Sequence, residues 1–262
     1  MKPTPYPELN AVLQELVTAV RVALGSDFVG AYLQGSFALG DFDEHSDVDF
    51  IIAVPDELSD SRVTTLQTIH PRIYDLGPEW AKHLEGSYFP LATLRDGKRS
   101  GTPLWYLDHG SRSLVRSDHC NTLVVRSILR EHGVVLAGPD RASLVDPIPV
   151  GALCQEMRDT MRDWGRQILE RPDAYRNRFY QGYLVLSYCR MLHDLIAGHP
   201  SSKRVGAAWA KANLEPAWSP LIDRAWDCRP NPAAAVREPP HTGDFERTLD
   251  FVRYVIRESE RY

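Results

Sequence analysis

The sequence predicts an α/β (α+β) N-terminal domain with a small mixed sheet, followed by an all-α helical-bundle domain. In the first 150 residues, short apolar runs typical of strands alternate with segments of helical spacing. After that point only helical spacing is found. A segment rich in Pro, Gly and polar residues, at positions 138–151 (GPDRASLVDPIPVG), separates the two regions. We therefore expect one domain over residues 1–150 and a second over residues 151–262.

The first 54 residues predict two helices and two strands. Residues 7–24 carry apolar side chains at steps of three and four, and Gly25 can end that helix. The apolar run at 28–33 predicts a strand, and residues 37–42 a short helix. The clearest strand in the chain is VDFIIAV at residues 48–54.

The rest of the chain predicts one more strand and several helices. Residues 58–69 have helical spacing, and residues 86–94 predict a strand. Because proline cannot donate to a ladder, Pro90 indicates an edge strand or a broken one. Four segments after the boundary have helical spacing, and residues 123–132 have it before the boundary. The four are residues 153–169, 179–197, 201–213 and 245–262.

Composition narrows the class of protein. The chain has 262 residues, of which 30 are basic and 35 acidic, giving a net charge of -5. This balance argues against a protein that coats nucleic acid, because such domains are usually basic. No apolar stretch is long enough to span a bilayer, and the N-terminus lacks the apolar core of a secretion signal. We expect a cytoplasmic monomer whose four cysteines, which form no CxxC pair, are free thiols.

One local pattern predicts chemistry: Gly35-Ser36, a nine-residue gap, and then Ser46-Asp47-Val48-Asp49. A glycine between a strand and a helix lets the backbone approach a phosphate closely, and the helix N-terminus offers unpaired N–H groups. Side chains alternate along a strand, so Asp47 and Asp49 share one face. Two neighbouring carboxylates repel each other unless a cation lies between them, and Mg²⁺ prefers such oxygen ligands.

Each part of this pattern has a simpler explanation. Two aspartates on a strand can belong to a solvated edge, and Gly-Ser is a common turn dipeptide. In this order and between two apolar strands, they favour phosphoryl or nucleotidyl transfer, which needs metal binding and in-line positioning.

The pattern resembles that of the DNA polymerase beta-like nucleotidyltransferase superfamily. Within the superfamily, the chain is similar to the aminoglycoside adenylyltransferases that modify streptomycin and spectinomycin. The similarity extends through five further segments. They are REHGVVLAGP at residues 130–139, DPIP at 146–149, LVLSYCR at 184–190, KRVGAAWA at 203–210 and DFVRYVIRE at 250–258.

The resemblance assigns roles to this chain's residues. It implies that Asp47 and Asp49 hold magnesium and the phosphates of ATP, and that Glu85, in LEGSYFP, is the general base toward the acceptor hydroxyl. Arg190 and Lys203 would bind the triphosphate, for which a forked and a point-charge donor are suited. Gly35, Ser36 and Ser46 complete the candidate nucleotide-binding residues.

The resemblance implies transfer of AMP from ATP to a hydroxyl of an aminoglycoside. Such drugs are polycationic, so we expect acidic and aromatic side chains around the acceptor. The corresponding positions are Arg176, Tyr180 and Tyr183, and none of them is acidic. Aromatic and acidic side chains elsewhere could substitute: Trp105, Tyr106, Asp108, Asp173 and Asp194.

The altered positions keep other functions open. The acceptor could be a different small molecule or a protein hydroxyl, or the chain could be a non-catalytic nucleotide sensor. Addition of nucleotides to RNA ends is disfavoured by the acidic balance. The histidines show no ligand spacing with the cysteines, and we interpret them as exposed or packed, although His45 lies beside the aspartates.

Overall fold

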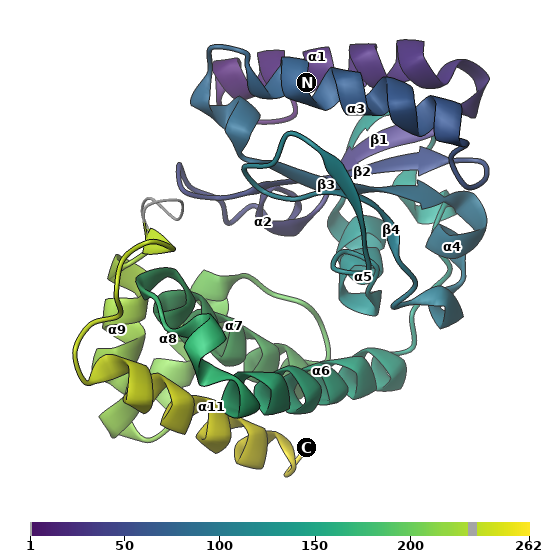
Figure 1. The fold of residues 1–262 in the computed structure, drawn as a ribbon. Helices are drawn as coiled ribbons and strands as arrows, with labels where there is room; N and C mark the ends of the chain where they lie inside the picture. Colours follow the sequence, from purple (N-terminus) through teal and green to yellow (C-terminus); the bar gives the residue numbers. More distant parts are fainter. Residues whose placement is uncertain (1, 230–234) are drawn as a thin grey trace. The chain divides into compact units, whose positions relative to one another are not determined.

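A computed structural model describes residues 2–229 and 235–262 of the chain. The chain folds into two compact units that divide between Ile148 and Pro149. The first unit is a sheet flanked by helices, and the second is built from helices (Figure 1). The predicted fold class is thereby confirmed.

The first unit alternates short strands with helices. Its strands are β1 (Gly30–Leu33), β2 (Val48–Val54), β3 (Leu84–Pro90), β4 (Leu104–Leu107), β5 (Leu114–Ser117) and β6 (Val134–Ala137). Its helices are α1 (Pro7–Leu24), α2 (Gly35–Leu39), α3 (Asp60–Tyr74), α4 (Leu91–Arg95) and α5 (Leu123–His132).

The six strands form one mixed sheet in the order β5-β4-β3-β2-β1-β6. Strands β2 and β3 are parallel, with α3 in the connection between them, and the other neighbouring strands are antiparallel. A parallel pair needs a long crossover, which α3 supplies. The parallel register pairs Asp49 with Glu85.

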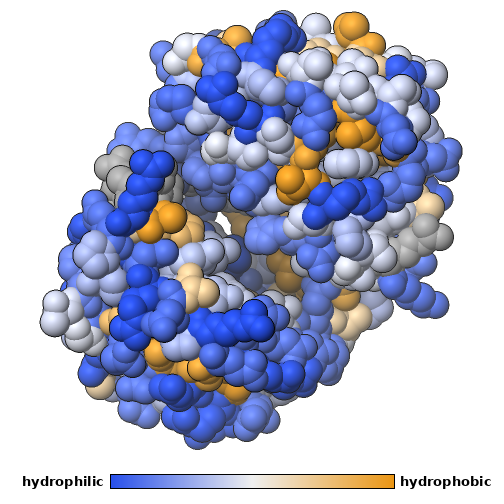
Figure 2. Space-filling view, in the orientation of Figure 1, coloured by the Kyte–Doolittle hydropathy of each residue, from blue (hydrophilic) through white to orange (hydrophobic). Residues whose placement is uncertain are grey.

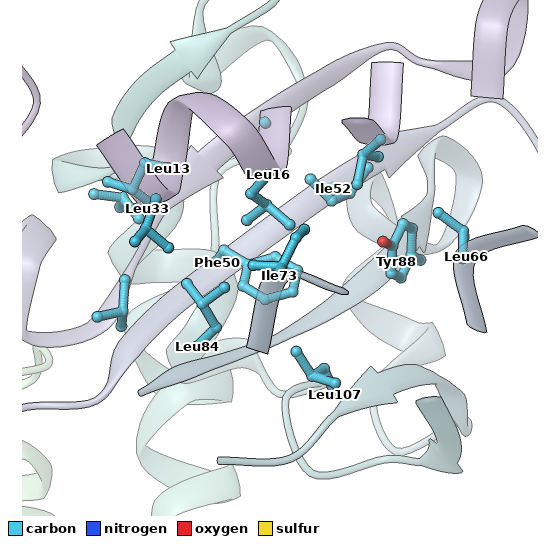
Figure 3. Close-up of a cluster of buried hydrophobic side chains, with 14 of the residues drawn as sticks. Leu13, Leu16, Leu33, Phe50, Ile52, Leu66, Ile73, Leu84, Tyr88 and Leu107 are labelled. Carbon is cyan, nitrogen blue, oxygen red and sulfur yellow. The ribbon is translucent and has the colours of Figure 1, made fainter. Parts of the chain in front are cut away.

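Alternation along the strands separates two cores. One set of side chains packs against α1 and α3, which lie on one side of the sheet (Figure 1). Figure 3 shows this core with Leu13, Leu16, Leu33, Phe50, Ile52, Leu66, Ile73, Leu84, Tyr88 and Leu107. On the other face, Ile51 and Phe89 pack with Leu94 of α4 and Leu129 of α5. In the central strands β1, β2 and β3, the side chains on both faces are therefore buried, except for the half-buried Asp49.

Of the two alternatives predicted for Pro90, the edge strand is wrong and the broken strand is confirmed, because the strand expected over residues 86–94 ends at Pro90 and the chain continues as α4. Strand β3 lies inside the sheet, between β2 and β4. Pro90 is its last residue, paired with Val54, and α4 begins at Leu91. A proline at the end of a strand interrupts no further ladder bond, so it ends the strand without placing it at an edge.

The sequence pattern does not predict several short elements, namely β4, β5, β6, α4 and α9 (Ser219–Asp227). Each of these strands has four residues, too few for alternation to be read. Helix α2 also begins two residues earlier than expected, at Gly35, and ends after Leu39. The Gly35-Ser36 dipeptide therefore forms the first turn of the helix.

The second unit contains α6 (Val150–Glu170), α7 (Arg178–Ala197), α8 (Lys203–Asn213), α9 and α11 (Asp244–Ser259). Helix α7 packs against each of the other four. Six consecutive α7 residues, Leu184 to Cys189, are buried, as expected for a helix enclosed on all sides. The predicted helical bundle is confirmed, with α7 at its centre.

The visible surface of each unit is mostly hydrophilic, and its apolar side chains form separate patches (Figure 2). Among the described helices, none combines the length and apolar character needed to cross a bilayer.

Helices α7 and α8 approach closely at Gly206. A Cβ at this position would overlap the backbone of Arg190, so α8 can pack this closely only with glycine there. Lys203 lies one turn earlier on α8. The glycine therefore fixes the spacing of two predicted nucleotide-binding residues within the second unit.

Replacing Gly206 with alanine is expected to destabilise the protein by about 1–3 kcal/mol through overpacking. The free energy of unfolding, from urea denaturation followed by circular dichroism, measures this effect. Gly151→Ala is the matched control, because a Cβ there meets no atom within 4 Å. Equal stability of the two variants would contradict the close approach at Gly206.

Candidate active site

Three carboxylates gather at the first residues of the parallel strand pair. Asp49 and Glu85 are the second residues of β2 and β3 and are register partners. Paired strands lie about 4.8 Å apart, so these side chains are neighbours on one face. Asp47 precedes β2 by one residue, and Val48 between the two aspartates is fully buried in the opposite core. The structure thus brings together all three predicted carboxylates.

Gly35 lies directly against Asp49. The backbone N–H of Gln34 donates to the carbonyl oxygen of Asp49 at 2.9 Å, which joins the end of β1 to the start of β2. Gly35 then has φ of +61°, and a Cβ on it would overlap the Asp49 carboxylate. Glycine is therefore needed here to leave room for a site carboxylate, a constraint that the sequence pattern did not reveal.

The two predicted serines lie at opposite ends of the connection from β1 to β2. Ser36 is in the first turn of α2, which ends at Gly40 with φ of +73°. The hydroxyl of Ser46 accepts a hydrogen bond from the backbone N–H of Asp43 at 2.9 Å. Ser46 therefore stabilises the turn that leads into Asp47.

Glu85 has two close partners from the β4–β5 region. The hydroxyl of Tyr106 lies 2.7 Å from Glu85 Oε1 and 2.9 Å from Asp108 Oδ1, so its single proton lies between two carboxylates. Nε2 of His119 lies 3.3 Å from the same Oε1. Glu85 itself is only 11% exposed in its side chain. A buried carboxylate is thus held by a phenol and an imidazole.

These contacts set the protonation of the group. Burial alone would raise the pKa of Glu85, but the bonds from His119 and Tyr106 and the charge of His119 lower the pKa below its usual value. The bond to Glu85 raises the pKa of His119 in spite of burial. Burial, and then the charge of Glu85, raise the pKa of Tyr106 far above its usual value. Glu85 is therefore ionised at neutral pH beside a phenol that keeps its proton.

Two further histidines lie beside Asp47. Nε2 of His109 is 3.4 Å from Asp47 Oδ1, and the rings of His83 and His109 are 5.2 Å apart. His83 immediately precedes β3, and His109 follows β4 by two residues. The backbone N–H of Gly110 donates to the carbonyl of Lys82 at 3.0 Å, which closes the ends of these antiparallel strands. Burial and the neighbouring His109 lower the pKa of His83.

Sequence reasoning missed these neighbours. We interpreted His109 and His119 as exposed or packed histidines, but each contacts a candidate carboxylate. Tyr106 and Asp108 were considered only for an acceptor pocket, whereas they contact each other and Glu85. No local spacing reveals such contacts, because the β4–β5 region reaches β2 and β3 only through the sheet.

The second unit carries the two predicted basic residues on adjacent helices. Arg190 is in α7, and Lys203 is the first residue of α8. Nζ of Lys203 lies 4.7 Å from the centre of the Tyr183 ring. The packing at Gly206 brings these two helices together, as described above.

The positions considered for an acceptor pocket have partners of their own in this unit. Arg176 forms ion pairs with Asp173 and Glu246, at 3.0 and 3.1 Å. Asp194 is buried and bonded to Ser201 and His193. Asp194 therefore stabilises the bundle and is not exposed toward a ligand.

Comparison with known proteins agrees with this arrangement. The family model "Nucleotidyltransferase domain" matches residues 15–88, a range that includes Gly35, Asp47, Asp49 and Glu85. The model "Aminoglycoside adenylyltransferase, C-terminal domain" matches residues 143–258. The chain is a nucleotidyltransferase related to the aminoglycoside adenylyltransferases.

Individual relatives are also named as aminoglycoside adenylyltransferases. The chain is 31% identical over 93 residues to the aminoglycoside (3'') (9) adenylyltransferase of Rhizobium radiobacter, a match that covers 36% of this chain and 32% of that protein. It is 23% identical over 231 residues to the enzyme of that name from Shigella flexneri, covering 82% and 83% of the two chains. Together with the nucleotidyltransferase family model, these relatives support an adenylyltransferase enzyme.

A solved structure has the same fold. It is described as spectinomycin adenyltransferase AAD(9) from Enterococcus faecialis with ATP and spectinomycin. The match has a TM-score of 0.69 at 13% identity and covers 94% of this chain and 98% of that one.

In this adenylyltransferase, Gly35→Ala is expected to displace the Asp49 carboxylate and to lower ATP turnover by at least about 100-fold, because a shift of about 1 Å has this cost. The control is Gly40→Ala, which shares a positive φ but has no atom within 4 Å of the added Cβ. Initial rates of pyrophosphate release measure both. If the two variants lose the same activity, backbone strain and not the carboxylate explains the loss.

His119→Gln is expected to move the acidic limb of the pH–rate profile to higher pH. As the predicted general base, Glu85 must be ionised to accept a proton, so activity is expected to fall as the pH drops through its pKa. Removing the imidazole removes an interaction that lowers this pKa. The profile of kcat/KM against pH measures the shift, with the exposed His132→Gln as control. A shift to lower pH would show that His119 does not stabilise the carboxylate.

Proposed function

We propose that the protein transfers AMP from ATP, in a magnesium-dependent reaction, to a hydroxyl of an aminoglycoside or aminocyclitol such as streptomycin or spectinomycin. The observation that carries the proposal is the register pairing of Asp49 with Glu85, beside Asp47, on one sheet face. Support for the acceptor class comes from the relatives named as aminoglycoside adenylyltransferases.

Asp47 and Asp49 fit a magnesium ion. They offer carboxylate oxygens from alternate positions of one chain segment, and Asp47 is 40% exposed, so it can meet solvent and phosphate oxygens. Because Gly35 has no side chain, the Asp49 carboxylate has room beside it. A bound magnesium ion would neutralise charge on the phosphates of ATP.

Glu85 is the proposed general base. It is ionised, largely buried and held at one oxygen by Tyr106 and His119. The acceptor hydroxyl would give its proton to Glu85 while its oxygen bonds to the α-phosphorus of ATP. The bond from that phosphorus to the bridging oxygen breaks, and pyrophosphate leaves. Asp108 would accept a hydrogen bond from the Tyr106 hydroxyl and so keep the phenol in place.

The remaining assignments concern ATP. Gly35 and Ser36, in the first turn of α2, are proposed to bind phosphate through backbone N–H groups and a hydroxyl. Ser46 would act by holding the turn before Asp47. Arg190 and Lys203 are assigned to the triphosphate on the family resemblance.

The proposal predicts pyrophosphate release from ATP and Mg²⁺ in the presence of one or more of streptomycin, spectinomycin and other aminoglycosides. Asp47→Asn and Glu85→Gln should each lower kcat by at least about 100-fold. Asp56→Asn is the matched control, because this exposed residue lies beyond the other end of β2 and should leave the rate unchanged.

The outcomes separate the candidate acceptors. Turnover with one drug that Asp47→Asn abolishes identifies the acceptor. If every drug is inert while magnesium-dependent ATP binding remains, the acceptor is a different small-molecule or protein hydroxyl. Absence of magnesium-dependent ATP binding would remove the catalytic proposal itself.

A further inference from the structure

One cluster at the site is not explained by oxygen ligands for magnesium. Asp47, His83 and His109 each offer one ligand atom, and these atoms all lie within 4.8 Å of one another. Among the described residues, no other set of three such side chains meets this criterion. Two imidazoles and a carboxylate form a donor set different from the pair Asp47 and Asp49.

The distances suit a metal ion. Two ligands about 2.0–2.1 Å from a tetrahedral zinc ion lie about 3.3 Å apart. The separation of Asp47 Oδ1 from His109 Nε2 is 3.4 Å. The ligand atom of His83 is within 4.8 Å of both.

Two buried ring nitrogens of the cluster lack a hydrogen-bond partner among the described residues. Nδ1 of His83 and Nε2 of His109 are buried and form no hydrogen bond within residues 2–229 and 235–262. Although His109 Nε2 lies near Asp47, the geometry is not that of a hydrogen bond. A buried polar atom without a partner has a free-energy cost, which ligation of a cation would remove.

The fold holds the two rings at this point. The Gly110–Lys82 bond fixes the ends of β3 and β4. The ring of Trp80 packs 5.6 Å from that of His83. The cluster is half-buried, and the His109 side chain is 24% exposed, so a cation has a route to it and three protein ligands leave a coordination position open.

We propose that Asp47, His83 and His109 bind a divalent ion of the late first-row transition series, such as Zn²⁺. Imidazole nitrogen favours these ions, whereas magnesium requires oxygen ligands. Asp47 belongs to both donor sets, so Zn²⁺ at this site competes with magnesium for its carboxylate. Zn²⁺ is therefore an inhibitor, a consequence that rests on the proposed function.

Binding can be tested without turnover. The full chain is titrated with Co²⁺ in buffer free of magnesium and ATP, and visible absorption is recorded. We expect one Co²⁺ per chain with bands of imidazole ligation. His83→Asn and His109→Asn should each weaken binding by at least about 100-fold. The exposed His132→Asn is the matched control and should bind as the unmodified chain does.

Several results would overturn the site. One is a visible spectrum typical of Co²⁺ bound by water and carboxylates alone. Another is an affinity for Co²⁺ that is unchanged in both His83→Asn and His109→Asn. Circular dichroism of each variant separates loss of a ligand from loss of the fold. Asp47→Asn should also weaken Co²⁺ binding, and an unaltered affinity would exclude the shared carboxylate.

A second experiment tests competition. Zn²⁺ at a fixed magnesium concentration should inhibit pyrophosphate release, and raising magnesium should relieve the inhibition. In His83→Asn the zinc concentration for half inhibition should rise by at least about 100-fold. Inhibition that His83→Asn leaves unchanged would contradict competition at this site. If no acceptor supports turnover, the proposed function fails while the Co²⁺ titration still decides the metal site.

Discussion

The parallel pairing of β2 with β3 is the constraint on which the site depends. It places Asp49 beside Glu85 on one face, with Asp47 one alternation away. Three like charges at this spacing repel one another, and an unpaired buried charge is costly. The sheet keeps them together because its central strands pack fully on both faces beyond the site, through α1 and α3 on one side and α4 and α5 on the other.

The neighbours of the carboxylates follow from that repulsion. Gly35 leaves space for Asp49, and a phenol and an imidazole contact Glu85. Asp47 has an imidazole at 3.4 Å. Apart from Gly35, these neighbours are Tyr106 in β4, His109 between β4 and β5, and His119 after β5. The antiparallel strands β4 and β5 therefore supply the side chains that contact the carboxylates of β2 and β3.

The sequence predicts most of the longer helices and strands, but few of the side chains that contact the three carboxylates. Helix α1 has the expected bounds because it is long and strongly periodic, and β2 was predicted at residues 48–54 because it is a nearly continuous apolar run. The order of Gly35, Asp47 and Asp49 also follows from local spacing. Strands β4 and β5 have four residues each, and their pairing with β3 depends on contacts distant in sequence. His109 and His119 could therefore not be assigned to carboxylates from spacing alone. Pro90 breaks the predicted strand without placing it at an edge, because it is the last residue of β3 and not a central one.

Two carboxylates of the same chemistry acquire different properties from their surroundings. Asp47 is 40% exposed and precedes its strand, whereas Glu85 is 11% exposed and bonded at one oxygen to a phenol. An exposed carboxylate can exchange water for metal and phosphate oxygens at little cost. A buried, oriented carboxylate with a protonated phenol beside it is held ready to accept one proton in one direction. The proposed division between ligand and base thus follows from the depth of each side chain in the sheet, and Asp49, which lies against Gly35, is placed next to both.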